Sequence, residues 1–179
     1  MIEPRGYKTI LADPPWPYKR TGKYCAGRYY DLMKIEDIIA LPVDEWTADD
    51  AVLFLWVTNG FLPWGFPIIK NWGFEYKTCF TWAKNKAGPG YWARGQTEHC
   101  LFAVKPKAKI LLPGNRRSTL IQAVVGRHSV KPSIMYDIAE SMGGEPRLEM
   151  FQRKYTDLFP VRDGWDVWGD ESIKGGNDD

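Results

Sequence analysis

Apolar residues occur in short runs along this chain, and most of the runs end at a turn-forming residue. The run KTILA at 8–12 predicts a strand that stops at a Pro-Pro turn. The continuous apolar run AVLFLWV at 51–57 is typical of a strand buried on both faces. Residues 74–84 are rich in strand-forming side chains. Shorter strands are predicted at 100–105, 147–151 and 165–168.

Three segments between these strands predict helices, at 34–41, 61–72 and 132–142. The last places its apolar side chains on one face, whereas the second carries two prolines that weaken the prediction. Glycine-containing segments at 17–31 and 85–97 predict loops. Strands that alternate with helices predict an α/β fold with a mostly parallel sheet and helices on both faces. Ligands of such sheets bind beyond the carboxyl ends of the strands.

The composition is that of a globular protein. Its 179 residues suit one compact domain, 1–179, and 44% of them are hydrophobic. No apolar run reaches the roughly 18 residues of a membrane span, and the N-terminus lacks the apolar stretch of a signal peptide. Three scattered cysteines without a Cys-x-x-Cys pair indicate a reducing, cytoplasmic setting. With two histidines, we expect no metal site.

Charge is unevenly spread along the chain, although the net value is only +2. Residues 84–131 contain ten basic side chains and one acid, a charge of +9, which leaves −7 for the remainder. Such a segment predicts a face that binds a polyanion such as nucleic acid. On charge alone, a solvated loop surface is an equally good interpretation.

The segment most specific for chemistry is Asp13-Pro14-Pro15-Trp16, directly after the first predicted strand. The exocyclic amine of adenine is a poor nucleophile because its lone pair is delocalised into the ring. Two acceptors aimed at its N–H bonds, the Asp13 carboxylate and the Pro14 carbonyl, would turn the lone pair toward a methyl donor. Both prolines fix φ and add no N–H donor. Trp16 offers a flat face on which a base can stack, worth about 1–3 kcal/mol. The alternative is an ordinary turn with a buried Trp.

The tetrad belongs to eight segments that, in this order, resemble the MT-A type of N6-adenine methyltransferase, the family of the subunit that methylates adenosine in eukaryotic messenger RNA. The eight segments are ILADPPW (10–16), Tyr30-x-x-Met33, LFLWVTN (53–59), NWGFEYKTCFTWAK (71–84), GYWARGQTEHCL (90–101), RHSVKP (127–132), LEMFQR (148–153) and GWDVWGDE (164–171). The resemblance covers nearly the whole chain. It implies a Rossmann-like, S-adenosylmethionine-dependent methyltransferase fold of the beta class. In that class the motif order is permuted, so the missing G-x-G-x-x-G after the first strand is expected.

The resemblance also implies a set of cofactor-binding residues. S-adenosylmethionine would lie against Ala12 and Asp13 and beside the late strand at 147–151. Lys131 would pair with its methionine carboxylate at the start of a helix, where the helix dipole adds favourable charge. Without the family, Lys131 would be interpreted as a surface lysine. By the same resemblance, further cofactor-binding residues are His128, Ser129, Arg153, Asp170 and Glu171.

Tyr30, Lys84 and Glu98 match family positions near the target base. Taken singly, each has a structural alternative: a half-buried Tyr, a surface Lys and a salt-bridged Glu. Trp92 and Arg94 lie in a glycine-rich loop and could stack on or grip a splayed strand. If the substrate is duplex, the adenine must be flipped out at a cost of a few kcal/mol, and binding should fall steeply with salt.

We therefore expect an active methyltransferase that acts on nucleic acid. DNA is expected rather than RNA, because short bacterial and phage members of the family are often DNA adenine methyltransferases. An RNA methyltransferase is the first alternative, since both substrates offer the same base edge. A non-catalytic nucleic-acid-binding subunit is the second, and the intact Asp13, Trp16 and Lys131 argue against it. A chain this small has little surface for reading sequence, so we expect relaxed specificity, a second subunit or a homodimer.

Overall fold

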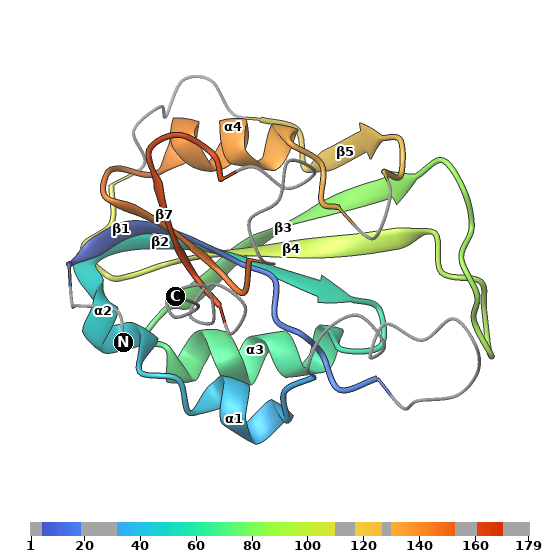
Figure 1. Cartoon of the computed structure of the whole chain (residues 1–179), viewed down its shortest axis with the longest axis horizontal. Coiled ribbons are helices and arrows are strands. Elements are labelled where there is room, and N and C mark those ends of the chain that lie inside the picture. Colours follow the sequence, from blue (N-terminus) through green and yellow to red (C-terminus); the bar gives the residue numbers. More distant parts are fainter. Residues whose placement is uncertain (1–4, 19–31, 110–116, 127–129, 153–160, 170–179) are drawn as a thin grey trace, which may run out of the picture.

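The computed structural model describes residues 5–18, 32–109, 117–126, 130–152 and 161–169. Within these residues a seven-stranded sheet is covered by helices on both faces (Figure 1). The elements in chain order are β1 (Tyr7–Ala12), α1 (Ile35–Ile39), α2 (Val43–Trp46), β2 (Thr47–Thr58), α3 (Leu62–Asn71), β3 (Glu75–Lys84), β4 (Thr97–Val104), β5 (Leu120–Ala123), α4 (Ile134–Met142), β6 (Arg147–Met150) and β7 (Trp165–Trp168).

The sheet has the strand order β5-β3-β4-β2-β1-β6-β7. Parallel pairs join β1 to β2, β1 to β6, β6 to β7 and β3 to β5. β4 runs antiparallel to both of its neighbours, β2 and β3. It does so because residues 85–96 connect β3 to β4 as a hairpin, whereas a parallel strand needs a crossover connection. The predicted α/β fold with a mostly parallel sheet is therefore confirmed.

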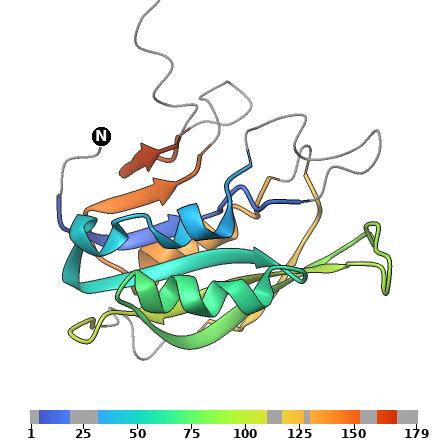
Figure 2. The same cartoon turned by 90° about the horizontal axis from the view of Figure 1, so that it is seen from below.

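Two hydrophobic cores lie on the two faces of the sheet. α1, α2 and α3 pack on one face (Figure 2), and α4 packs on the other (Figure 1). β2 contributes to both cores, because successive side chains of a strand point to opposite faces. Leu53, Leu55 and Val57 join the core under α3, while Phe54 and Trp56 join the core under α4. This division explains the continuous apolar run that predicted a strand buried on both faces.

Two elements were not predicted from the pattern of apolar residues. α2 has only four residues, of which Val43 and Trp46 are buried. β5 is equally short and lies at the edge of the sheet, where only Ile121 of its four side chains is buried. Elements of this length show too few periods to be recognised. The predicted helix at 61–72 does form as α3, and Pro63 is tolerated there because it lies in the first turn.

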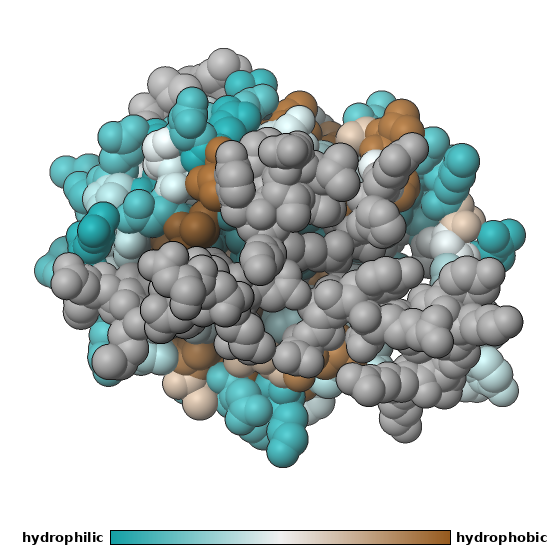
Figure 3. Space-filling model, in the orientation of Figure 1, coloured by the Kyte–Doolittle hydropathy of each residue, from teal (hydrophilic) through white to brown (hydrophobic). Residues whose placement is uncertain are grey.

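The described surface is mixed in polarity. Among the residues that Figure 3 colours, most are hydrophilic, and the hydrophobic ones form separate areas between them. Within the described ranges, no helix has both the length and the apolar character to cross a bilayer. The most exposed large apolar side chains are Tyr91 and Trp92, at 92% and 95% exposure. Both lie in the loop between β3 and β4.

Candidate active site

Asp13 follows the last residue of β1 and lies between the ends of two neighbouring strands. Ala12, the residue before it, pairs in register with Leu55 of β2 and with Met150 of β6. The backbone N–H of Asp13 donates to the carbonyl of Met150, with an N···O distance of 3.4 Å. The tetrad therefore begins at the carboxyl end of a central parallel strand, where such sheets bind their ligands.

The Asp13 carboxylate is bound by Lys131, which precedes α4. The Lys131 ammonium lies 2.5 Å from Oδ2 of Asp13, and its side chain is 18% exposed against 42% for Asp13. The interpretation of Lys131 as a surface lysine is therefore wrong. Burial alone would lower the pKa of Lys131, but the carboxylates of Asp13 and Glu98 outweigh it and hold the pKa above its ordinary value. Lys131 consequently stays charged at neutral pH.

Glu98 connects Lys131 to a second lysine. Its Oε2 lies 3.5 Å from the Lys131 ammonium, and its Oε1 accepts a hydrogen bond from Lys84. The side chain of Glu98 is only 12% exposed, so both ion pairs are largely shielded from solvent. Both ammonium groups also lie over indole rings, Lys84 at 4.9 Å from the centroid of Trp82 and Lys131 at 5.6 Å from that of Trp56.

The result is a row of alternating charges, Asp13–Lys131–Glu98–Lys84, at the end of the sheet where β1 and β3 finish. We call it the charge row. Its members come from four places in the sequence: the end of β1, the segment before α4, the start of β4 and the end of β3. The reversal of β4 puts its first residues beside the last residues of β3. Lys84 and Glu98, two predicted substrate-binding residues, are thus brought to the carboxylate of Asp13, the predicted catalytic residue.

The surroundings of the Pro14 carbonyl and of the Trp16 ring differ from those that the sequence predicted. The Pro14 carbonyl accepts the backbone N–H of Trp16, with an N···O distance of 2.9 Å, so it is not free of donors. Its second lone pair still allows one more hydrogen bond. Trp16 is 3% exposed, and its ring stacks on Phe61 with 5.2 Å between centroids. The prediction that Trp16 offers an open face to a base is therefore wrong, because its ring packs in the core under α3.

Trp92 and Arg94 lie in the loop that joins β3 to β4. Trp92 is almost fully exposed, as a base-stacking side chain must be, and packs edge-on against Tyr91. The Arg94 guanidinium donates to two carbonyls of its own loop, at 3.2 Å to Gly88 and 3.1 Å to Ala87. Arg94 thus holds the loop that presents the two aromatic rings.

A buried carboxyl at the end of β6 was missed by the sequence reasoning. Oε1 of Glu149 accepts a hydrogen bond of 2.7 Å from the hydroxyl of Tyr136 on α4. Burial raises the pKa of Glu149 to about 7; the Tyr136 hydrogen bond opposes this shift and the Asp13 carboxylate adds to it. The available signal was an acidic residue between Leu148 and Met150 in a short buried strand.

The remaining predicted site residues divide into two groups. Ala12 is fully buried in the core under α3, and its contact with the cofactor stays a prediction. The others lie outside the described residues: Tyr30, His128, Ser129, Arg153, Asp170 and Glu171. Among the residues that the structure describes, no group of three or more His, Cys, Asp or Glu side chains could hold a metal ion.

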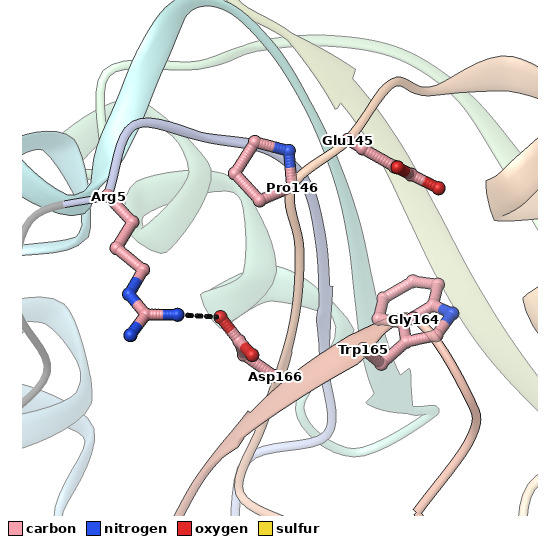
Figure 4. A pocket seen from close by; sticks show the side chains of 6 residues that line it. All are labelled: Arg5, Glu145, Pro146, Gly164, Trp165 and Asp166. Carbon is pink, nitrogen blue, oxygen red and sulfur yellow. Dashed lines mark hydrogen bonds and ion pairs between the residues drawn. The ribbon is translucent and has the colours of Figure 1, made fainter.

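One surface pocket lies at the opposite ends of the strands from Asp13. Arg5, Glu145, Pro146, Gly164, Trp165 and Asp166 line it. Figure 4 shows the Arg5 guanidinium next to the Asp166 carboxylate, at 3.3 Å. These residues precede or begin β1, β6 and β7, so the pocket opens at the amino ends of the parallel strands. It is therefore separate from Asp13 and the charge row.

Comparison with known proteins gives a family match over most of the chain. The family model described as MT-A70 matches residues 7–171. The Type II methyltransferase M.MunI of a Mycoplasma species is 33% identical over 186 residues, which cover 91% of this chain and 76% of that protein.

Two eukaryotic proteins are similar at lower identity. The human N(6)-adenosine-methyltransferase catalytic subunit METTL3 is 26% identical over 174 residues, 92% of this chain and 28% of that protein. The N6-methyladenosine RNA methyltransferase MTA1 of Cryphonectria parasitica is 28% identical over 187 residues, 94% of this chain and 52% of that protein. The chain therefore spans only a part of these longer relatives.

Proposed function

We propose that this chain, which belongs to the MT-A70 family, transfers the methyl group of S-adenosylmethionine to the exocyclic amine of adenine in DNA. The chain is an N6-adenine methyltransferase, since the family match extends over residues 7–171 and the relatives are methyltransferases. Methyltransferases of this family generally use S-adenosylmethionine. Binding of that cofactor by this chain, and the choice of DNA, are the proposals.

The observation that carries the proposal is the Asp13 carboxylate at the carboxyl end of β1, held by Lys131 at 2.5 Å. A carboxylate accepts hydrogen bonds through both oxygens. Asp13 can therefore accept one N–H of the adenine amine while Lys131 stays bound. The free lone pair of the Pro14 carbonyl supports acceptance of the second N–H. These two bonds localise the nitrogen lone pair, and most of the rate enhancement comes from such positioning and electrostatics.

The charged side chains around Asp13 fit the charges of S-adenosylmethionine. Lys131 supplies a cation for the methionine carboxylate, and Asp13 and Glu149 supply anions for its positive groups. Oε2 of Glu149 is buried without a hydrogen-bond partner among the described residues, so it retains an acceptor for a ligand. When bound, the cofactor supplies a methyl group activated by its sulfonium charge. The protein's part is to hold that group in line with the amine.

DNA is proposed as the substrate from the resemblance to short bacterial and phage members and from the 76% coverage of the Type II methyltransferase. The RNA alternative draws on the N(6)-adenosine and RNA activities named for the eukaryotic relatives. A second subunit also remains a proposal, since METTL3 is named as the catalytic subunit of an N(6)-adenosine-methyltransferase. The intact Asp13 and Lys131 favour a catalytic chain over a non-catalytic one.

One experiment tests the substrate choice. Purified protein is incubated with S-adenosylmethionine carrying a labelled methyl group and, in parallel, with single-stranded DNA, duplex DNA and RNA of the same sequence. Nucleoside mass spectrometry then identifies the modified base. We expect labelled N6-methyldeoxyadenosine from a DNA arm. Label found only in the RNA arm would transfer the proposal to RNA, and label in no arm would contradict methyl transfer by the chain alone.

The loop between β3 and β4 should contribute to nucleic-acid binding. Replacing Trp92 with alanine is expected to weaken DNA binding about tenfold, because stacking on an exposed aromatic side chain contributes about 1–3 kcal/mol per base. Fluorescence anisotropy with a labelled oligonucleotide measures the change. Trp64→Ala, which removes a half-exposed ring on α3, serves as the matched control. Equal losses in the two variants would argue against a specific role for Trp92.

A further inference from the structure

Glu149 makes no contact with the reacting amine in the proposed reaction, but its carboxyl group lies beside the proposed cofactor site. It lies on the α4 side of the sheet, where Tyr136 binds its Oε1 at 2.7 Å. Its Oε2 is buried and unpartnered among the described residues. Burying a carboxyl with one oxygen unsatisfied is unfavourable. A partner that arrives with the ligand would remove this penalty.

Glu149 is also close to the catalytic carboxylate. In the parallel pair of β1 and β6, Leu11 is in register with Glu149, and Ala12 is in register with Met150. Asp13 continues β1 past this pair, so the two carboxyl groups lie near each other at the ends of adjacent strands. The negative charge of Asp13 contributes to raising the pKa of Glu149, after the larger effect of burial. The ionisation state of Glu149 therefore responds to the charge in the site.

The described charges around the site do not cancel when all are ionised. Two ammonium groups, on Lys84 and Lys131, pair with the carboxylates of Asp13 and Glu98. Glu149 adds a third carboxyl, on which the charge of Asp13 acts. The sum is one negative charge. S-adenosylmethionine carries one net positive charge at neutral pH, because its sulfonium and ammonium exceed its carboxylate by one. The product S-adenosylhomocysteine has lost the sulfonium and carries no net charge.

We propose that Glu149 is a specificity-determining residue that loses its proton when S-adenosylmethionine binds and keeps it when S-adenosylhomocysteine binds, so that the site selects the methyl donor over the product. This inference rests on the proposed function. During transfer the carbon–sulfur bond breaks, the new carbon–nitrogen bond forms and the amine releases one proton. Glu149 takes up one proton from solvent as the sulfonium charge disappears, and no further reactant is needed.

Titration calorimetry at several pH values tests the proposal without measuring activity. A site that must lose a proton with a pKa near 7 binds about eightfold more tightly at pH 7.5 than at pH 6. We expect this gain for S-adenosylmethionine. S-adenosylhomocysteine, which binds while Glu149 keeps its proton, should instead bind about fourfold more weakly at pH 7.5 than at pH 6. Repeating the titrations in buffers of different ionisation enthalpy should show release of about half a proton per S-adenosylmethionine at pH 7.

Three variants separate Glu149 from other sources of proton release. Glu149→Gln should bind both ligands with little difference in pH dependence between them, since the ligand's own amine titrates equally in both proteins. Tyr136→Phe removes the hydrogen bond that lowers the pKa of Glu149, so the gain in affinity should move to higher pH. Glu145→Gln, at the amino end of β6, should behave as the wild type. Circular dichroism confirms that each variant is folded.

The outcomes distinguish this inference from the proposed function. If neither ligand binds at any pH, the cofactor proposal fails and this inference fails with it. If both ligands bind with the same pH dependence in the wild type, only the role of Glu149 is refuted. Unchanged proton release in Glu149→Gln would also refute it, because the proton would then come from another group.

Discussion

Replacing Asp13 with alanine is expected to abolish methyl transfer, with a loss of at least about a thousandfold in rate, while the protein stays folded. The expected size follows from removing an acceptor that acts directly on the reacting amine. Asp13→Asn keeps the shape of the side chain but lacks the charge, so it should lose at least about a hundredfold. Single-turnover transfer from labelled S-adenosylmethionine to an adenine-containing oligonucleotide measures both variants.

The control for Asp13 is a second carboxylate in a lysine pair. Asp49 pairs with Lys107 at 2.7 Å on the surface, with both side chains about three-quarters exposed. Asp49→Asn removes the same functional group and leaves the charge row unchanged, so its transfer rate should match the wild type. Asp13→Ala with more than a tenth of wild-type activity would exclude Asp13 from the chemical step.

Lys131→Met is expected to weaken binding of S-adenosylmethionine by about thirtyfold or more. Removing one member of a largely buried charged pair costs about 2–5 kcal/mol in binding, and the proposed partner is the methionine carboxylate. An ammonium has three N–H donors, so Lys131 can bind Asp13 and the ligand at the same time. Calorimetry gives the dissociation constant directly.

The same substitution should also lower thermal stability, because Asp13 and Glu98 would lose their shared cation at a shielded position. Lys107→Met, in the exposed pair with Asp49, controls for loss of a lysine in general and should leave both quantities close to the wild type. A folded Lys131→Met protein with an unchanged dissociation constant would refute the role of Lys131 in cofactor binding.

Much of the sheet was predictable because its strands carry enough apolar side chains to be recognised locally. β2 is the clearest case, since six of its residues from Val52 to Val57 are buried in the two cores. β5 was not predictable, because a single buried side chain in an edge strand leaves no pattern. The reversal of β4 depends on how the loop at 85–96 folds back, which no local pattern of β4 itself encodes.

The candidate site was predictable only in part, for the same reason. Asp13, Lys131, Glu98 and Lys84 were each singled out from the sequence, but their arrangement as the charge row was not. Lys131 and Asp13 are 118 positions apart, so their contact arises from tertiary structure. The Trp16 ring was predicted to be open because the sequence does not show that Phe61 lies against it.

The reversed strand β4 also has a consequence for how such an enzyme can diversify. Because β3 and β4 form a hairpin, its tip can lengthen, shorten or be exchanged without altering any crossover helix or the register of the other strands. The tip carries Tyr91 and Trp92, whereas Asp13 follows β1 and its partner Lys131 precedes α4, so neither belongs to the hairpin. Under the proposed role of Trp92 in nucleic-acid binding, grafting the corresponding tip of a relative onto this chain should alter substrate preference and leave the Asp13–Lys131 pair unchanged.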